Sequence, residues 1–454
     1  MTDLRTLALA AGLLACPTLV DACCGLYVAK TEASPYDRGA RVVLARDGER
    51  TVMTIVNDYA GEPTEFAMLV PVPAVLERDQ VHLGENAPLD HLDAYTAARL
   101  HEQFDPDPCQ MIQSEAAARA KVAEAVPGER RERTRGVRIE SRSAIGEYEI
   151  VMPSAAQGAA PAAWLEEEGY ALSEDAASML ASYVRRGMSF FLVKTTLRER
   201  TGAGYDTLRP LQVAFESAEL SLPIRLDVPN AEGPRDLVLY TLTRAGRVEA
   251  ANYPTVRMPT DVEVPAFVMD DPERFYAAVA DAQVARSVAD TVFLEYAGDL
   301  NACDPCTADP PTDEELRALG VFWELRETEP QGVFSPDHPE RSIALPRARN
   351  VFVTRLRLRQ GDGAFPADLV LRETADRASF QSRYLLRHAW EGTAACEAAR
   401  IYQAGLPARS ERLAQALAGL TGEEVDPIRA RMGLEVPEPP PPSAERWWGR
   451  IWKD

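Results

Sequence analysis

Residues 295–325 read EYAGDLNACDPCTADPPTDEELRALGVFWEL, and this stretch contains the feature on which the class of the protein depends. Cys303 and Cys306 form a C-x-x-C pair in a chain that has seven cysteines. Such a pair serves as a redox centre, as half of a metal site or as part of a disulfide framework. The residues around the pair favour one of these uses over the other two.

A redox C-x-x-C normally lies at the start of a helix, where the helix dipole stabilises a thiolate. The nearest predicted helix start is the capping box of residues 312–315, TDEE, and two prolines, Pro310 and Pro311, separate it from the cysteines. Asp304, between the two cysteines, disfavours a thiolate because like charges repel. A zinc site requires a second ligand pair at similar spacing, which the other cysteines do not form. We therefore predict disulfides, and keep a redox centre and a metal site as alternatives.

The first residues have the pattern of an export signal. Arg5 precedes an uncharged run over residues 6–20, which Pro17 interrupts. This run of fifteen residues is too short to span a bilayer but has the length of a signal-peptide core. We predict cleavage after Ala22 and export to the periplasm or cell envelope, where disulfides persist. A lipoprotein-like cut, which would leave lipid on Cys16, is the alternative.

Either cut leaves six cysteines for pairing, because the alternative cut would place lipid on Cys16, and an even number is typical of an exported disulfide framework. The disulfide candidates are Cys23, Cys24, Cys109, Cys303, Cys306 and Cys396. We predict that Cys303, Cys306 and Cys396 are all oxidised, because of the export signal and the even number of cysteines. Links to distant cysteines would restrict the unfolded chain more than a local link. The spacing of the cysteines does not select one set of pairs.

The composition predicts an acidic globular protein. The chain has 454 residues, a formal net charge of −21 and a hydrophobic content of 46%, which suffices for the cores of two or three domains. Nucleic acids and anionic lipid surfaces repel a strongly negative chain. We therefore expect no nucleic-acid partner, and we interpret the charge as a solvated surface.

Hairpin patterns dominate the first part of the chain. Residues 41–46 and 51–57 predict two strands joined by an Asp-Gly turn. Residues 65–72 predict a third strand, and Pro71 predicts that this strand ends at a sheet edge, because proline lacks an N–H group. The next predicted element is a helix near residues 93–104.

Later segments add helices and a strictly alternating strand. Residues 145–196 predict a strand–helix–helix–strand unit. In residues 351–359, VFVTRLRLR, the alternation places Arg355, Arg357 and Arg359 on one face. Because hairpin turns outnumber β–helix–β alternations, the predicted class is α+β, with antiparallel β-sheets, segregated helices, disulfide links and a helical C-terminal extension.

The predicted organisation ends in an unusual tail. The predicted parts are a signal peptide (residues 1–22), an N-terminal α+β subdomain (23–227) and a C-terminal α+β subdomain with the C-x-x-C loop (228–396). A helical extension (397–436) and a proline-rich spacer with a tryptophan-rich tail (437–454) follow. The contact candidates of the tail are Trp447, Trp448, Ile451 and Trp452. These side chains either fold back into a groove of the body, or make a weak contact with a membrane interface or an envelope protein partner.

Several pieces of the chain, taken in order, resemble one exported bacterial family. They are ACCG at 22–25, EFAMLVPVPAV at 65–75, IGEYEIVMPSA at 145–155, SYVRRGMSFFLVK at 182–194, the C-x-x-C segment at 302–321, and VTRLRLRQGDGAFPADLVLRE at 353–373. The family is known as domain of unknown function 2330. The resemblance implies export and supplies no activity. The adjacent Cys23 and Cys24 depart from the family, whose first cysteines are commonly spaced apart.

The chain carries no complete catalytic signature, since it has no G-x-S-x-G, no P-loop and no G-x-G-x-x-G. His101 and Glu102 begin an H-E-x-x-H pattern that fails because its last position is Asp105. His91, Asp93 and His101 could gather around a metal, but their spacing does not place both histidines on one helical face. We therefore predict no metal and no cofactor.

Two classes of function remain. The first is a non-enzymatic binding or scaffolding protein of the envelope, and the second is an enzyme. The enzyme would be an envelope hydrolase with converging carboxylates whose pKa values are moved apart, or a thiol–disulfide protein that uses Cys303 and Cys306. Because the C-x-x-C pair is set apart from a helix start, we favour the first class.

Overall fold

The computed structural model describes residues 20–22, 25–29, 36–60, 65–110, 148–151, 162, 165–166, 169–170, 172, 174–196, 209–225, 235–300, 309–323, 350–361 and 364–435. The chain forms two compact units, each assembled from three segments. Unit 1 contains Met1–Ala97, Ser141–Arg257 and Ala289–Phe380, and unit 2 contains Ala98–Glu140, Met258–Val288 and Gln381–Asp454.

This division differs from the predicted boundary at residue 228. Strand β3 (Tyr36–Asp47) pairs in parallel with β12 (Arg235–Thr243), so that segments of both predicted subdomains share one sheet. A boundary at residue 228 would cut this sheet in two. The pairing joins strands that are far apart in the sequence, and no local pattern of either strand indicates its neighbour.

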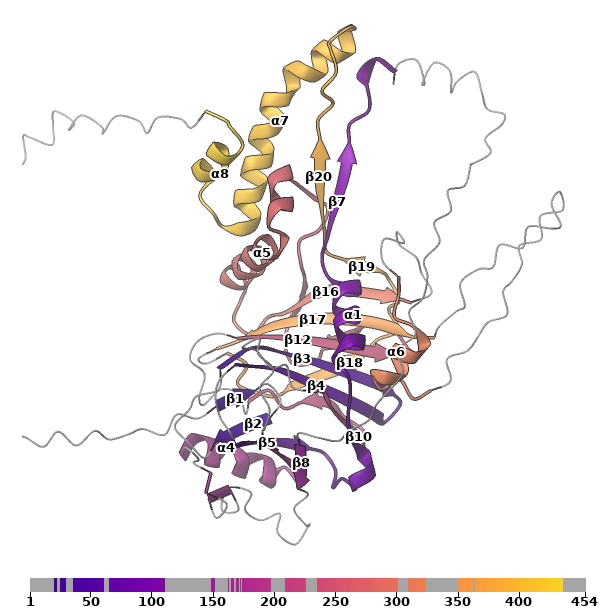
Figure 1. Ribbon diagram of the computed structural model, residues 1–454, viewed down its shortest axis with the longest axis vertical. Helices are drawn as coiled ribbons and strands as arrows, with labels where there is room; N and C mark the ends of the chain where they lie inside the picture. The colour runs from indigo at the N-terminus through magenta and orange to yellow at the C-terminus, as the bar shows by residue number, and fades with distance from the viewer. Residues whose placement is uncertain are drawn as a thin grey trace, which may run out of the picture. The chain divides into compact units, whose positions relative to one another are not determined.

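Unit 1 is built on one large mixed sheet (Figure 1). Its strands in spatial order are β14 (Thr255–Arg257), β16 (Val292–Asp299), β17 (Phe352–Gln360), β12, β3, β4 (Arg50–Ala60), β10 (Leu211–Glu216) and β6 (Val81–Leu83), with β19 (Phe380–Gln381) beside β16. The predicted hairpin is confirmed as β3 and β4, and the turn between them contains Gly48 at a φ of 65°, which favours glycine. Along β17, Leu356 and Leu358 are buried in the core, as the predicted alternation requires.

Two smaller antiparallel sheets complete unit 1. The strand order of the first is β1 (Val20–Ala22), β2 (Gly25–Ala29), β5 (Glu65–Val72), β9 (Ser189–Thr196) and β8 (Tyr148–Val151). The order of the second is β11 (Leu220–Leu222), β18 (Leu369–Glu373) and β13 (Val248–Ala250). β5 lies between β2 and β9, but β2 pairs with it only between Phe66 and Leu69, whereas β9 pairs with it as far as Val72. Among the described residues, the end of β5 that contains Pro71 therefore has no partner on the β2 side, as predicted.

The core of unit 1 lies between the large sheet and the smaller sheets. Val42, Ile55 and Leu239 of the large sheet belong to one buried cluster with Val70 of β5 and Leu369 of β18. Burial of each such side chain contributes about 1.5–3 kcal/mol of hydrophobic free energy. These three sheets are therefore held together mainly by apolar packing.

Helices cover the faces that the sheets leave open. α1 (Asn86–Thr96) and α6 (Asp313–Ala318) pack on the other face of the large sheet, and α4 (Glu174–Arg185) packs on β5 and β9. A short 3-10 helix, η1 (Arg78–Gln80), precedes β6. The predicted capping box of α6 is confirmed, because Thr312 and Glu315 exchange side-chain and backbone hydrogen bonds of 2.6 and 3.2 Å.

Unit 2 contains a parallel sheet of three strands in the order β15 (Val262–Val264), β20 (Arg383–His388) and β7 (Arg99–Phe104). Its helices are η4 (Ala266–Asp270), α5 (Pro272–Arg286), α7 (Glu397–Thr421) and α8 (Val425–Arg431). Phe275 of α5 meets Tyr384 of β20 edge to face, with ring centroids 4.9 Å apart. In Figure 1, α7 runs beside β20 and β7.

The predicted helical extension is confirmed as α7 and α8. α7 ends at Gly422, whose φ of 75° is a left-handed conformation that glycine adopts without strain. The side chain of Arg429 in α8 donates a hydrogen bond of 3.0 Å from Nε to Glu411 of α7. Hydrogen bonds from Arg429 and Gln415 lower the pKa of Glu411 to about 2.

The predicted helix near residues 93–104 is only partly correct. α1 ends at Thr96, and the next residues form β7 instead. The Thr96 hydroxyl donates a hydrogen bond of 2.7 Å to the carbonyl of Leu92, and Ala97 already has an extended ψ of 156°. The backbone then pairs with β20, and this tertiary pairing overrides the local helical propensity.

The predicted α+β class, with antiparallel sheets, a disulfide and a helical C-terminal region, is confirmed. Within the described ranges, no helix combines the length and the apolar character that a membrane crossing requires. Several predicted features lie outside these ranges: the signal run before Val20, the C-x-x-C loop, Cys23, Cys24, Trp447, Trp448, Ile451 and Trp452.

Candidate functional site

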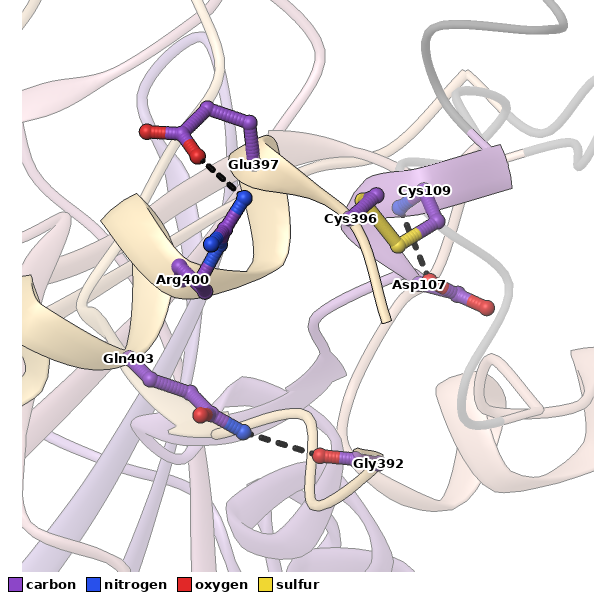
Figure 2. Close-up of a disulfide and its surroundings, with 7 residues drawn as sticks. All are labelled: Asp107, Cys109, Gly392, Cys396, Glu397, Arg400 and Gln403. Carbon is purple, nitrogen blue, oxygen red and sulfur yellow. Dashed lines mark hydrogen bonds and ion pairs between the residues drawn. A yellow bond between two sulfur atoms is a disulfide. The ribbon is translucent and has the colours of Figure 1, made fainter. Parts of the chain in front are cut away.

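A disulfide joins the segments that follow β7 and β20 in unit 2 (Figure 2). Cys109, in the helical turn of residues 108–110, is bonded to Cys396, which directly precedes α7. Their Sγ atoms are 2.12 Å apart, and their Cα atoms are 5.9 Å apart. Because β7 and β20 already pair, the disulfide fixes two segments that the sheet has brought together. We call residues 104–110 and 388–409 the braced end.

Within the braced end, Asp105 connects the segment that follows β7 to α7. Its carboxylate accepts hydrogen bonds from the hydroxyl of Tyr402 at 2.7 Å and from Nη1 of Arg409 at 2.5 Å, and Arg387 lies 3.7 Å away. Burial alone would raise the pKa of Asp105, but the hydrogen bonds from Tyr402 and Arg409 and the charges of the two arginines lower it. The carboxylate is therefore ionised, and it ties two strands' ends to one helix.

A second set of contacts holds the segment between β20 and α7. The backbone N–H of Trp390 donates a hydrogen bond of 2.9 Å to the hydroxyl of Tyr402. The side-chain amide of Gln403 donates a hydrogen bond of 2.9 Å to the carbonyl of Gly392, as Figure 2 shows. A Cβ atom at Gly392 would lie 2.0 Å from the indole ring of Trp390, so the close approach of this ring requires glycine.

An aromatic side chain stands out from the end of β7. Phe104 is 73% exposed, and its ring stacks on the imidazole of His388 with centroids 4.4 Å apart and planes 12° apart. Nε2 of His388 lies 2.9 Å from Oε1 of Glu102, which fixes the plane of the imidazole. The exposed ring is therefore held in a defined orientation, although one of its faces remains open to solvent.

The outer edge of β7 is unpaired among the residues that the structure describes. β7 is the last strand of its sheet, and the N–H groups of Arg99 and Asp105 donate to carbonyls of the β20 segment at 2.9 Å. Because backbone groups alternate along a strand, those of Leu100, Glu102 and Phe104 point away from β20. The edge thus offers a row of backbone donors and acceptors that ends at the exposed Phe104.

The carboxylates of unit 1 gather in a different place, on the face of the large sheet that α1 covers. Glu295 accepts hydrogen bonds from Arg355 at 2.6 Å and from Arg357 at 2.5 Å. Asp236 binds Arg357 at 2.9 Å and Arg359 at 2.7 Å, and Asp93 of α1 binds Arg355 at 2.9 Å. Three acids and three arginines therefore form a neutral ladder. The three arginines are those that the alternation of β17 places on one face.

The pKa shifts of this ladder differ from those of a hydrolytic pair. Burial would raise the pKa values of Glu295 and Asp236, but their arginine partners lower both. A pair of catalytic acid and base needs pKa values that move apart. Burial raises the pKa of the Glu373 carboxyl. This carboxyl is not one of the three acids of the ladder, and it lies 3.4 Å from Nε of Arg46. The ladder therefore serves to pair charges at a sheet face.

The histidine cluster considered as a metal site is not brought together. Nδ1 of His91 lies 2.8 Å from the carboxylate of Glu315, and its Nε2 lies 3.0 Å from the carbonyl of Asp309. The carboxylate of Asp93 forms an ion pair with Arg355, and His101 lies on β7 in the other unit. Among the described residues, no group of three or more His, Cys, Asp or Glu side chains could hold a metal ion.

Of the six disulfide candidates, the structure joins Cys109 with Cys396. The pairing of the other candidates remains a prediction. Sequence reasoning missed Phe104, His388 and Tyr402. Residues 99–104, RLHEQF, contain no β-branched side chain, and the strand exists because of its partner β20.

Comparison with known proteins supplies a family and no activity. No curated protein matches the chain. The crystal structure of baculovirus P35 is 9% identical, and the similarity covers 47% of this chain and 66% of that chain with a TM-score of 0.26, which is too low to indicate a shared fold. A family model described as "Uncharacterized protein conserved in bacteria (DUF2330)" matches residues 18–372, which include most segments of unit 1 and β7 of unit 2. The chain therefore belongs to this family of uncharacterized bacterial proteins.

Proposed function

We propose that the protein is an exported, non-enzymatic binding protein of the cell envelope. In this proposal the outer edge of β7 with Phe104 is the contact surface. The partner is a protein that contributes an extended segment. The observation that carries the proposal is the 73% exposure of Phe104 at the end of a strand edge that no other described strand pairs with.

An extended segment suits this edge because it can add a strand to the sheet. The outward backbone groups of Leu100, Glu102 and Phe104 would provide main-chain hydrogen bonds, which give affinity without sequence preference. The ring of Phe104 would provide the anchor, since buried aromatic side chains dominate the energy of many interfaces. His388 holds this ring and Cys109–Cys396 holds the segment behind it, so little conformational entropy is lost on binding.

Export is a separate part of the proposal. The uncharged run of residues 6–20 supports it, and so does the Cys109–Cys396 disulfide, because disulfides persist in oxidising compartments. Cleavage after Ala22 would remove β1 and leave β2 at the edge of its sheet. Cell fractionation combined with mass determination of the mature N-terminus tests this part. A cytoplasmic protein that retains residues 1–22 would contradict it.

The tail remains a second proposed contact, through Trp447, Trp448, Ile451 and Trp452. Aromatic and basic side chains together favour a membrane interface or a partner protein. Deletion of residues 446–454 separates the two interpretations of the tail. A contact role predicts altered envelope fractionation at an unchanged Tm, whereas a Tm that falls by several degrees with unchanged fractionation would make the tail part of the fold.

Site-specific photocrosslinking tests the β7 surface. The photoreactive residue benzoylphenylalanine is placed at position 104 in a host that exports the protein, and at Val75 of unit 1 as the control, because Val75 is 60% exposed. We expect a crosslinked product of one defined mass from position 104 and none from position 75. No product at position 104, or equal products at both positions, would contradict the proposal.

A pair of proline variants tests whether the strand edge takes part. The N–H group of Glu102 points outward, so Glu102→Pro should abolish the crosslink at position 104 while unit 2 stays folded. The N–H group of Gln103 points toward β20, so Gln103→Pro should unfold the sheet itself. Glu102→Ala removes the contact with His388 and keeps the N–H group, so it controls for the loss of that contact.

A further inference from the structure

The side chains of β7 alternate between the two faces of its sheet. Leu100, Glu102 and Phe104 share one face, because side chains along a strand point to alternate sides. His388 of β20 lies on the same face, where it contacts both Glu102 and Phe104. The Glu102 side chain is 46% exposed, and Leu100 is half-buried. A strand added to this edge would therefore meet an apolar, an acidic and an aromatic side chain at alternate positions.

One segment of the chain has the complementary alternation. Residues 448–452 read WGRIW, so that positions 448, 450 and 452 carry an apolar, a basic and an apolar side chain. In an extended strand these three side chains share one face. The two tryptophans would meet the apolar side chains of β7, and Arg450 would lie opposite Glu102. Because the pattern is symmetric about Arg450, this ion pair forms in a parallel and in an antiparallel arrangement alike.

We propose that the outer edge of β7 binds residues 448–452 of a second copy of this chain. The inference rests on the contact surface proposed above and names its partner. Aromatic contact with Phe104 would anchor the segment, and the pair of Arg450 with Glu102 would fix its register. The segment suits an acidic partner, because residues 446–454 contain three basic side chains and one acid in a chain of net charge −21.

The path of the chain favours a second copy over the same chain. The backbone N–H of Leu434 donates a hydrogen bond of 2.9 Å to the carbonyl of Arg429, which is itself bonded to α7, so the chain leaves α8 beside α7. Twelve residues, 436–447, precede Trp448, and five of them are prolines. Such a sequence favours a stiff, extended spacer with a reach of about 35 Å. A tail that returned to its own β7 would have to bend this spacer.

The contact between two copies is expected to be weak. A segment of five residues buries less than the roughly 1,200 Å² of a stable interface. A two-fold exchange, in which each copy binds the tail of the other, doubles the contact. We therefore expect association at high protein concentration, whereas the edge of β7 stays open in the isolated protein.

Photocrosslinking of the purified full chain tests this partner. Benzoylphenylalanine is placed at position 104, and the protein is irradiated at high and at low concentration. We expect a product with the mass of two chains, whose yield rises with concentration and whose acceptor maps to residues 447–454. A crosslink within one chain, or no product, would overturn the inference. A product with a different protein in the exporting host would then leave the proposed contact surface standing, whereas no product there would overturn both.

Charge reversal tests the central pair. Arg450→Glu and Glu102→Arg should each lower the yield of the two-chain product by about tenfold, because attraction becomes repulsion. An equimolar mixture of the two variants should restore the yield, since the edge of one then meets the tail of the other. Lys453→Glu makes the same change of charge on the other face of the tail, and the yield should stay within about twofold. Equal losses in both tail variants, or no recovery in the mixture, would contradict the pairing.

Discussion

At the scale of single residues, the ion pairs of the large sheet make the stability of unit 1 depend on pH. Glu295 is buried between Arg355 and Arg357, and these partners lower its pKa in the folded protein. The folded protein therefore binds fewer protons than the unfolded chain near the ordinary pKa of glutamate, about 4.3. The stabilisation is present above that value and is lost as the pH falls through the lowered pKa.

Glu295→Gln should reduce the free energy of unfolding at pH 7 by about 3 kcal/mol, because Arg355 and Arg357 each lose one of their two carboxylate partners at a buried position. The variant should also lose part of the acid sensitivity of the wild type. Urea unfolding at pH 7 and pH 4 measures both effects. Glu216 is exposed at the end of β10, and Glu216→Gln is expected to change neither quantity. Equal effects of the two variants would show that the ladder does not stabilise the fold.

A pair of glycines in unit 2 tests the packing of the braced end. Gly392→Ala places a methyl group against the indole of Trp390 and should cost about 1–3 kcal/mol through overpacking. Gly405 lies in α7, and a methyl group added there would meet no other atom within 4 Å, so Gly405→Ala should stabilise the helix by about 1 kcal/mol. Thermal unfolding followed by tryptophan fluorescence should therefore shift in opposite directions. Shifts of the same sign would contradict the contact at Trp390.

At the scale of elements, Asp105 links β7 and β20 to α7. Asp105→Ala removes the charge-assisted hydrogen bonds to Tyr402 and Arg409 and should lower the free energy of unfolding of unit 2 by about 3 kcal/mol. Asp261→Ala removes an exposed ion pair with Arg383 and should cost less than about 1 kcal/mol. Chemical denaturation of both variants measures how much free energy of unfolding each substitution removes. A cost for Asp105→Ala as small as that of the control would mean that α7 is held by other contacts.

The elements also show how far the sequence predicts the fold. The hairpin of β3 and β4 and the alternation of β17 follow from local patterns, and the structure contains both. β7 could not be predicted in this way, because RLHEQF contains no β-branched residue and acquires its conformation from pairing with β20. The candidate site depends on this strand, so the sequence predicted its cysteines but not Phe104 or the open edge.

At the scale of the whole molecule, the two units are assembled from alternating segments of the chain. The boundary at residue 228 was based on sequence order, which carries no information on parallel pairing between β3 and β12. The disulfide closes a loop of 287 residues in sequence, yet the paired strands β7 and β20 already bring its ends together. We expect the disulfide to stabilise the folded protein by less free energy than a loop of that length suggests.

The double variant Cys109→Ser with Cys396→Ser should therefore destabilise unit 2 by about 2 kcal/mol, at the low end for disulfides. Unit 1 contains neither cysteine and should unfold unchanged. Scanning calorimetry of wild type and variant resolves this as one shifted and one constant transition. Equal shifts of the whole profile would indicate that the two units unfold as one.

Amide hydrogen exchange at β7, resolved by residue, tests most directly the claim that this strand presents an open edge. The N–H groups of Arg99, His101, Gln103 and Asp105 face β20 and should exchange slowly. Those of Leu100, Glu102 and Phe104 face outward and should exchange fast in the isolated protein. Slow exchange at all seven positions would contradict the account, because another part of the chain would then already occupy the edge that we assign to a partner.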